Sequence, residues 1–318
     1  MMESDARRLG SISNRTKNIS INSKALFALA FISIIWGSTY LASKKGVTVM
    51  PALQLAGMRQ LFAGLLYLIF FILKKAPWPK GKQWGTILLL GFLNFLLSNG
   101  LSTWGVKFIS SGLAAIIAAI FPLWLVLLLG LKGERLPNKS LIGLVLGFLG
   151  ICVIFFDHLK DFLNPDFLFG IILSFIATIS WAFGTIITKN QATNFNPYFS
   201  LGFQMVISGV TLLTLVNSSG YSVNISQIPA TGWYALAYLV LLGNVCTFVA
   251  YIYTLKNLPT TLASVYAYIN PIVAVALGAI LLGEKITGYI IVGGIVTIGG
   301  VYLVNYGLTK KNLDKLIT

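Results

Sequence analysis

Two prolines inside apolar stretches are the first residues of this sequence whose type could contribute chemistry. Pro122 and Pro271 each lack a backbone N–H, so a helix that runs through them leaves the carbonyl groups of Ala118 and Ala267 without their usual donor. In apolar surroundings such a carbonyl must be satisfied by a neighbouring helix or face a watery cavity. The prolines are therefore either packing kinks or parts of a gate where free acceptors meet a ligand, and Asn270 favours the cavity for Pro271.

Amide, hydroxyl and aromatic side chains also occur within apolar stretches. An amide left unsatisfied in hydrocarbon is costly, so these groups must point inward, either as contacts between helices or as a binding site. Ring faces attract an ammonium group and amides fix its orientation, which suits a small zwitterion. The candidate binding residues are Trp36, Tyr40, Asn94, Asn99, Trp181, Thr185, Tyr251, Tyr268 and Asn270.

Three basic residues at or inside apolar stretches could act as anchors or as ligand contacts. Lys44 and Lys189 each end such a stretch, where the C-terminal dipole of a helix stabilises a cation and the long side chain can reach water. The alternative is a pair of entrance charges, one on each face, that meet a carboxylate. Arg59 lies within another stretch and is either a similar anchor or a charge partner.

The eight carboxylates fall in tails or in connections between apolar stretches. A drug/proton antiporter of the small multidrug type relies on an acid inside the membrane, and this sequence offers none there. It also lacks a buried histidine, an acid pair or a metal cluster, so we expect neither catalysis nor a metal or cofactor. Glu134 and Glu284 are expected to cap tight turns or to pair with neighbouring basic groups.

The composition assigns the chain to a lipid bilayer. Hydrophobic residues make up 57% of it and charged residues 10%, whereas a soluble domain carries about a quarter charged residues. Because about 20 mostly apolar residues cross a bilayer as a helix, we predict an all-α membrane protein with ten transmembrane helices. Cys152 and Cys246 lie inside these segments and are expected to be core residues. The predicted spans are 25–44, 52–73, 85–106, 110–131, 140–156, 168–188, 198–216, 232–255, 258–282 and 287–307.

The basic residues are distributed unevenly between the two sides of these spans. With the N-terminus inside, 17 Lys and Arg residues fall in cytoplasmic segments and five fall outside. This bias predicts that both termini are cytoplasmic. The net charge of +15 is spread over loops without an aromatic platform, so we expect no nucleic-acid partner.

The sequence repeats itself after about 150 residues. The stretch "WGSTYLASK" at 36–44 aligns with "WAFGTIITK" at 181–189, and "GER" at 133–135 aligns with "GEK" at 283–285. Each copy holds five spans, an odd number, so the copies must be inverted relative to each other. Inverted repeats are typical of secondary transporters, with the substrate site near the midplane between the copies.

The repeat also predicts the domain organisation. We expect a disordered cytoplasmic tail at 1–24, a first five-helix repeat at 25–156, a second at 168–307 and a cytoplasmic tail at 308–318. Small residues recur at matching points of the two copies, and we interpret them as scaffold that lets helices pack closely. These scaffold residues are Gly143, Gly147, Gly150, Gly293, Thr297 and Gly300.

Together these motifs resemble the drug/metabolite transporter superfamily, in its bacterial ten-helix branch of EamA-type metabolite and amino-acid exporters. The resemblance covers about residues 25–307 and is carried by "WGSTY", by "MRQLFAG" with Arg59, and by "ASVYAYINPIVAVALGAILLGEKIT". It implies a multi-pass transporter of the inner (plasma) membrane that moves small polar metabolites by alternating access, without ATP or a bound cofactor. Gln204 stands where the repeat would place a second Arg59, so any role of that arginine is confined to one half.

The expected partners are a small-molecule substrate and the lipid bilayer, and the expected assembly is a monomer or weak dimer. An amino acid or a close derivative is the favoured substrate, exported or exchanged along its gradient. A sugar, nucleoside or drug carrier of the same fold is the alternative within transport. A membrane enzyme or a channel is the alternative from another class.

Overall fold

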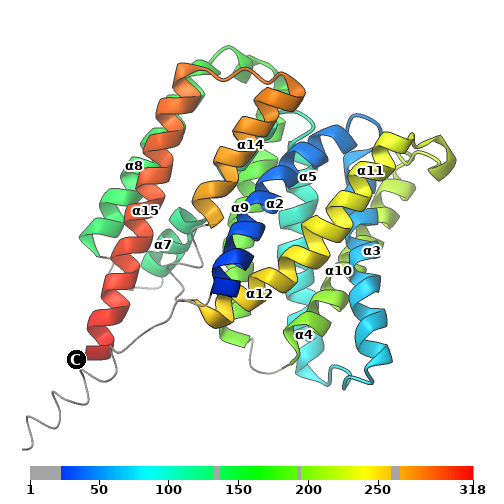
Figure 1. The fold of residues 1–318 in the computed structure, drawn as a ribbon. Coiled ribbons are helices and arrows are strands. Elements are labelled where there is room, and N and C mark those ends of the chain that lie inside the picture. Colours follow the sequence, from blue (N-terminus) through cyan, green and yellow to red (C-terminus); the bar gives the residue numbers. More distant parts are fainter. Residues whose placement is uncertain (1–22, 132–136, 192–194, 259–265, 318) are drawn as a thin grey trace, which may run out of the picture.

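The computed structural model describes residues 23–131, 137–191, 195–258 and 266–317. Within these ranges the regular elements are all helices, which confirms the predicted all-α fold (Figure 1). Among the described residues, nine helices are long and apolar enough to cross a membrane. Tyr266–Leu282, with 17 residues, is a shorter apolar helix and supplies the tenth. The predicted span 258–282 therefore lies partly outside the described residues.

The first repeat contains five spans. They are α2 (Ser23–Gly46), α3 (Ala52–Leu73), a composite of α4 (Lys82–Leu90), η1 (Gly91–Gly100) and α5 (Leu101–Gly105), a pair α6 (Ser111–Ala119) and α7 (Phe121–Leu131), and α8 (Asn138–Asp157). The second repeat follows a short turn, η2 (Asp161–Leu163). Its spans are α9 (Pro165–Gln191), α10 (Pro197–Ser218), a composite of α11 (Ala230–Tyr238), η4 (Leu239–Cys246) and α12 (Thr247–Asn257), α14 (Tyr266–Leu282) and α15 (Gly288–Ile317), with a turn η3 (Ile225–Gln227) before α11.

Equivalent helices of the two repeats pack against each other. Figure 1 shows α8 beside α15 at one side of the bundle and α3 beside α10 at the other, the two helix pairs with the most extensive contact. A methyl group added to Gly143 would lie 2.5 Å from the carbonyl oxygen of Gly300, and one added to Gly293 would lie 2.6 Å from that of Gly150. The backbones can approach this closely only because these residues have no side chain.

The other scaffold residues behave in the same way. A methyl group on Gly147 would lie 2.5 Å from Leu123 of α7, and one on Gly150 would overlap Thr297. In the second helix pair, a methyl group on Gly64 would lie 2.9 Å from the carbonyl oxygen of Gly202. The prediction that these small residues let helices pack closely is confirmed.

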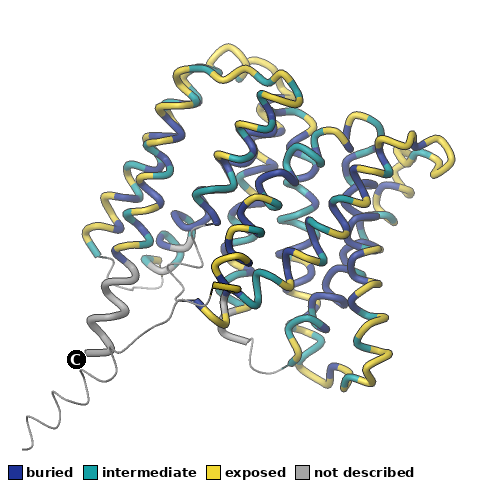
Figure 2. The backbone as a smooth tube through the Cα atoms, in the orientation of Figure 1, coloured by how far each residue is buried: buried dark blue, intermediate teal, exposed yellow. Residues whose placement is uncertain are grey.

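The outer surface of the bundle is apolar. Figure 2 shows exposed residues along the outward faces of the helices and buried residues between them. Large side chains such as Ile69, Val145 and Ile295 are more than half exposed, which suits a surface covered by lipid chains. Cys152 and Cys246 are also exposed, so the prediction that they are core residues is wrong.

Three spans depart from a regular α-helix. The fourth span is interrupted at Ile120, two residues before Pro122, while Ser111–Leu128 as a whole is long and apolar enough to cross a membrane, so the predicted span is present and contains a kink. Pro271, by contrast, lies inside α14 without ending it. The third and eighth spans each contain a π-helical segment, η1 and η4. Such segments are frequent at functional sites, and both lie next to the cavity described below.

Candidate functional site: a central cavity between the repeats

A cavity of about 150 Å³ lies in the centre of the bundle. Its wall combines helices of both repeats: α2, α3, η1, α5, α6 and α7 from the first, and α9, α12 and α14 from the second. The wall is mixed in chemistry, with indole and phenol rings, amides and hydroxyls among small apolar residues. Its polar and aromatic members are Trp36, Thr39, Tyr40, Ser43, Arg59, Ser98, Asn99, Ser102, Thr103, Phe121, Thr178, Trp181, Phe248, Tyr266 and Asn270.

Five of the predicted binding residues line this cavity. They are Trp36, Tyr40, Asn99, Trp181 and Asn270. The wall also includes Ala118 and Ala267, whose carbonyl groups lose their helical donor to the two prolines. Pro122 and Pro271 themselves lie outside the wall.

Trp36 is held firmly in the wall. Its indole N–H donates to the carbonyl oxygen of Gly243 at 3.3 Å, which ties α2 to η4 of the other repeat. Its ring packs against Tyr266, with ring centroids 5.1 Å apart, and against Tyr251 and Phe248 at 5.2 and 5.6 Å. Because the indole N–H is already used, the ring presents its face and edge to the cavity rather than a donor.

Asn270 links α14 to α2. In the amide orientation that satisfies both neighbours, its side-chain nitrogen donates to the carbonyl oxygens of Tyr266 and Ser33, each at 2.9 Å. This orientation leaves the side-chain oxygen as an acceptor in the wall of the cavity. An ammonium or hydroxyl group of a ligand is the kind of donor that it could receive.

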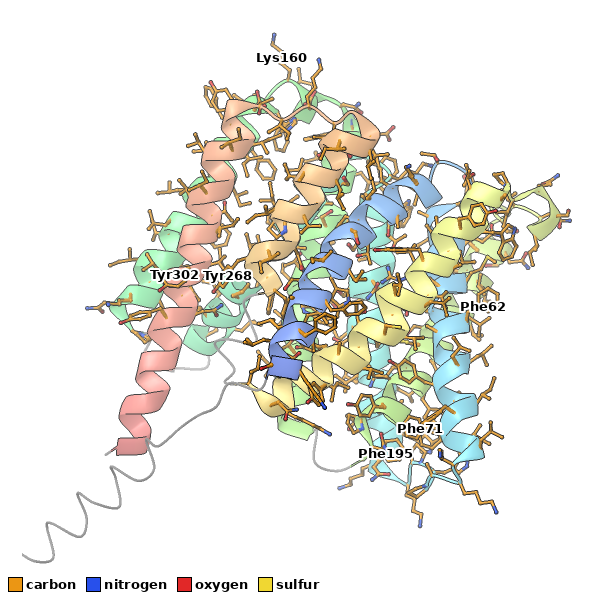
Figure 3. The ribbon with its side chains drawn as sticks, in the orientation of Figure 1. Phe62, Phe71, Lys160, Phe195, Tyr268 and Tyr302 are labelled. Atoms are coloured by element: carbon orange, nitrogen blue, oxygen red, sulfur yellow. The ribbon has the colours of Figure 1, made fainter. Side chains whose placement is uncertain are left out.

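Four predicted binding residues lie outside the wall. Tyr268 contacts α15, where its hydroxyl lies 3.3 Å from the carbonyl oxygen of Val301 and hydrogen-bonds Asn305, and Figure 3 shows it beside Tyr302. Tyr268 and Asn270 are two positions apart in the sequence, about 200° around a helix, so both cannot face one cavity. Tyr251 packs its ring against that of Trp36, with centroids 5.2 Å apart, and does not line the cavity.

The other two are occupied by local contacts. Asn94 is buried in η1, with its side-chain oxygen against the backbone of Gly184 on α9. The hydroxyl of Thr185 donates back to the carbonyl oxygen of Trp181 at 2.8 Å, within the same helix. Asn94 therefore packs η1 against α9, whereas the hydroxyl of Thr185 is satisfied within its own helix.

Lys44 caps a neighbouring turn. Its ammonium nitrogen lies 2.9 Å from the carbonyl oxygen of Val106, 3.2 Å from that of Lys107 and 2.7 Å from that of Ile109. These contacts connect the end of α2 to the turn after α5. Lys44 lies in the last turn of α2, as predicted, and its ammonium in addition ties that helix end to the turn after α5. The side chain of Lys189 lies outside the part of the structure that is described.

Arg59 is a cavity residue that the sequence did not place in the site. Arg59 as a whole is 6% exposed, and its Nε and Nη2 atoms donate to the side-chain oxygen of Asn244 at 2.9 and 2.7 Å. Asn244 in turn donates to the side-chain oxygen of Gln60 at 3.1 Å. The phenol of Tyr40 lies near the guanidinium and hydrogen-bonds Ser102. The available signal was that an ionisable residue inside a membrane span is functional by default.

Glu284 connects the two repeats at one end of the bundle. Its carboxylate accepts from the backbone N–H of Ser111 at 2.7 Å, from the Ser111 hydroxyl at 2.9 Å and from the N–H of Gly112 at 3.3 Å. The expected turn cap is therefore a cap on α6, a helix of the other repeat. Lys160 marks the same end of the bundle in Figure 3, while Phe71 and Phe195 mark the opposite end.

The described residues hold few charged contacts. The Nδ1 atom of His158 and a carboxylate oxygen of Asp161 lie 2.6 Å apart, outside the cavity. The same part of the chain contains no group of three His, Cys, Asp or Glu residues that could hold a metal ion. Among described residues, the cavity wall carries one cation, Arg59, and no carboxylate. The arrangement is suited to binding a small polar molecule.

Comparisons with known proteins agree with this arrangement. The model of the EamA-like transporter family matches residues 23–156 and 168–306, one match for each half of the chain. The "Uncharacterized inner membrane transporter YedA" of Escherichia coli K12 is 34% identical over 266 residues, covering 83% of both chains. The "Uncharacterized transporter YoaV" of Bacillus subtilis is 25% identical over 300 residues, covering 91% of this chain and 99% of its own.

The fold is also found in a solved structure. A crystal structure aligns with 92% of this chain and 99% of its own, with a TM-score of 0.63. Sequence identity over this alignment is 15%, so the likeness concerns the fold alone.

Proposed function

This chain belongs to the EamA-like transporter family, and on that premise we propose that it moves small zwitterionic metabolites, amino acids or close derivatives, across the membrane. The observation that carries the proposal is the central cavity, whose wall joins both repeats and combines two indole rings, Trp36 and Trp181, with the amides of Asn99 and Asn270. Aromatic faces attract an ammonium group, and carbonyl and amide oxygens without another donor accept hydrogen bonds from its N–H groups.

We propose that the cargo crosses by alternating access between the repeats. At the Glu284 end, the contacts of Lys44 and Glu284 join neighbouring helices and repeats, which supports a closed state at that end. The break at Ile120 and the proline inside α14 lie in equivalent spans next to the cavity, where small rotations would open one end or the other. The proposed direction is outward, driven by the gradient of the cargo, in an inner membrane with both termini cytoplasmic.

A panel of fluxes into liposomes that contain the purified protein tests this proposal. The panel compares labelled amino acids, sugars, nucleosides and cationic dyes, with empty liposomes as the control. We expect saturable counterflow of at least one amino acid. Counterflow of sugars alone would instead favour the alternative carrier, which the hydroxyls of Ser43, Ser98, Ser102 and Thr103 in the wall would suit. Conductance without saturation would identify a channel.

A further inference from the structure

We propose that Arg59 binds an anionic group of the cargo, and that this group is a carboxylate if the cargo is the zwitterion proposed above, on which this assignment rests. Arg59 then fixes one end of the cargo, and the ring faces and amides around Trp181 and Asn270 receive the other end. The inference assigns an orientation to the cargo and names the residue that discriminates it from amines and neutral compounds.

The hydrogen-bond count of the guanidinium leads to this assignment. A guanidinium has five N–H groups, and Asn244 receives two of them, one from Nε and one from Nη2. One N–H of Nη2 and both of Nη1 remain without a partner among the described residues. The edge formed by Nη1 and Nη2 thus has two parallel donors free, the geometry that a carboxylate or phosphate group accepts in bidentate fashion.

The charge of Arg59 is also unbalanced. Arg59 is buried, at 6% exposed, and the acceptor of its guanidinium, the side-chain oxygen of Asn244, is neutral. No carboxylate among the described residues pairs with it. A buried charge without a counter-ion is strongly unfavourable, and an anionic ligand in the adjoining cavity would remove this penalty. The binding energy of the anionic ligand would then come from the charge of Arg59, which the protein leaves without a counter-ion.

Lys44, a second cation in this half, does not compete with Arg59 for the anionic group of the cargo. An ammonium has three N–H groups, and the three carbonyl oxygens of Val106, Lys107 and Ile109 surround that of Lys44. On the opposite repeat, the position equivalent to Arg59 is Gln204, whose amide nitrogen donates to Ser200. The cation is therefore present on one side of the cavity, and the cargo would bind in one orientation.

Asn244 acts as a positioning residue. It lies in the π-helical segment η4, and it receives two donors from Arg59 while it donates to Gln60. This chain of contacts holds the guanidinium with its Nε edge turned to the protein. An aspartate at position 244 would keep the shape but would supply the missing negative charge, and so would compete with the cargo for Arg59.

The test uses the purified full-length protein in liposomes, and the amino acid with the highest flux in the panel above. It compares that amino acid with its carboxamide, which lacks the carboxylate, and with its des-amino acid, which lacks the ammonium. We expect the parent to prefer the amino acid over the carboxamide by tenfold or more in KM. Arg59→Gln, which copies the residue of the other repeat, should raise KM for the amino acid at least tenfold and abolish the preference.

Three further variants keep the test decisive. Arg59→Lys retains the charge without the parallel donors and should fall between parent and Arg59→Gln. Asn244→Asp should lose the preference while its melting temperature stays near that of the parent, an outcome that a purely structural role of Asn244 would not give. Lys285→Gln is the control, because it removes an exposed cation outside the cavity wall, and it should keep the preference.

The outcomes separate this inference from the proposed function. If Arg59→Gln transports the amino acid and the carboxamide in the same ratio as the parent, the assignment of Arg59 is overturned while amino-acid transport stands. If Arg59→Gln does not fold, the same result with Asn244→Asp overturns the assignment. If the parent moves des-amino acids but no amino acid, the zwitterion is wrong and Arg59 is retained. If the parent moves sugars or amines alone, both are wrong.

Discussion

Removal of the Glu284 carboxylate should destabilise the protein by detaching α6 from the other repeat. The first N–H groups of a helix have no partner inside it. In α6 those of Ser111 and Gly112 donate to Glu284, and that of Leu113 donates to the Ser110 hydroxyl at 3.1 Å. Glu284→Ala therefore leaves two backbone donors and the Ser111 hydroxyl without an acceptor.

The expected magnitude follows from these contacts. Hydrogen bonds to a charged group contribute about 1.5–3 kcal/mol, and a negative charge at a helix N-terminus adds about 0.3–1 kcal/mol. Because the three contacts share one carboxylate and are not additive, we expect Glu284→Ala to cost about 2–4 kcal/mol. Glu284→Gln keeps one acceptor oxygen of the two that are used, so it should cost about half as much.

Thermal melting in detergent, followed by fluorescence-detected gel filtration, ranks these variants by their melting temperatures. The parent should melt highest, then Glu284→Gln, then Glu284→Ala. The exposed neighbour Lys285 provides the control. Lys285→Ala should change the free energy of unfolding by less than about 0.5 kcal/mol. Counterflow by Glu284→Gln should persist when the pH gradient is collapsed, because the carboxylate caps a helix instead of relaying protons.

A double-mutant cycle tests the reasoning itself. Ser111→Ala removes the hydroxyl that donates to Glu284 at 2.9 Å. It should cost less in the Glu284→Ala background than in the parent, by about 0.5 kcal/mol or more. If the two effects add, or if Glu284→Ala melts like the parent, the carboxylate does not hold α6 and the account of this end of the bundle is refuted.

The cavity, the scaffold and the topology each allow a further test. Asn270→Ala and Trp181→Ala should weaken substrate affinity about tenfold, since an unmade polar contact costs about 1–3 kcal/mol; parental KM values at normal expression would show that these residues only pack. Gly300→Leu should reduce the amount of folded protein in the membrane, because even a methyl group there would meet the backbone of Gly143 at 2.6 Å; normal yield would contradict the close packing of α8 and α15. A cysteine at Asp161, with the native cysteines replaced, should be labelled from outside intact cells, and labelling only after permeabilisation would reverse the predicted orientation.

The repeat made much of the fold predictable. The aligned halves gave the number of spans per repeat, their inversion and the small residues between α8 and α15, because periodic small residues and apolar lengths are local properties of the sequence. A kink was one of the two predicted roles of each proline, but which proline would interrupt its helix was not predictable in this way. Pro122 and Pro271 occupy equivalent positions, yet only the first interrupts its helix, so tertiary contacts and not the proline alone decide the outcome.

The site was predictable in kind but not residue by residue. Aromatic and amide side chains inside spans had to face inward, and Trp36, Trp181 and Asn270 do line the cavity. Tyr268 does not, because the sequence fixes the angle between Tyr268 and Asn270 but not which of the two faces the centre. The pairing of Arg59 with Asn244 joins residues 185 positions apart, and no local pattern indicates such a contact.

Blockage of the cavity is the most direct test of the central claim, that the cargo passes between Trp36, Trp181 and Asn270. In a cysteine-free background, with Cys152 and Cys246 replaced, Ala118→Cys places a thiol in the cavity wall, and Lys160→Cys places one at the exposed end of the bundle as the control. Reaction with a small methanethiosulfonate should abolish counterflow in Ala118→Cys, the cargo should slow that reaction, and Lys160→Cys should react without loss of flux. Full counterflow by completely modified Ala118→Cys would show that the cargo does not pass through this cavity.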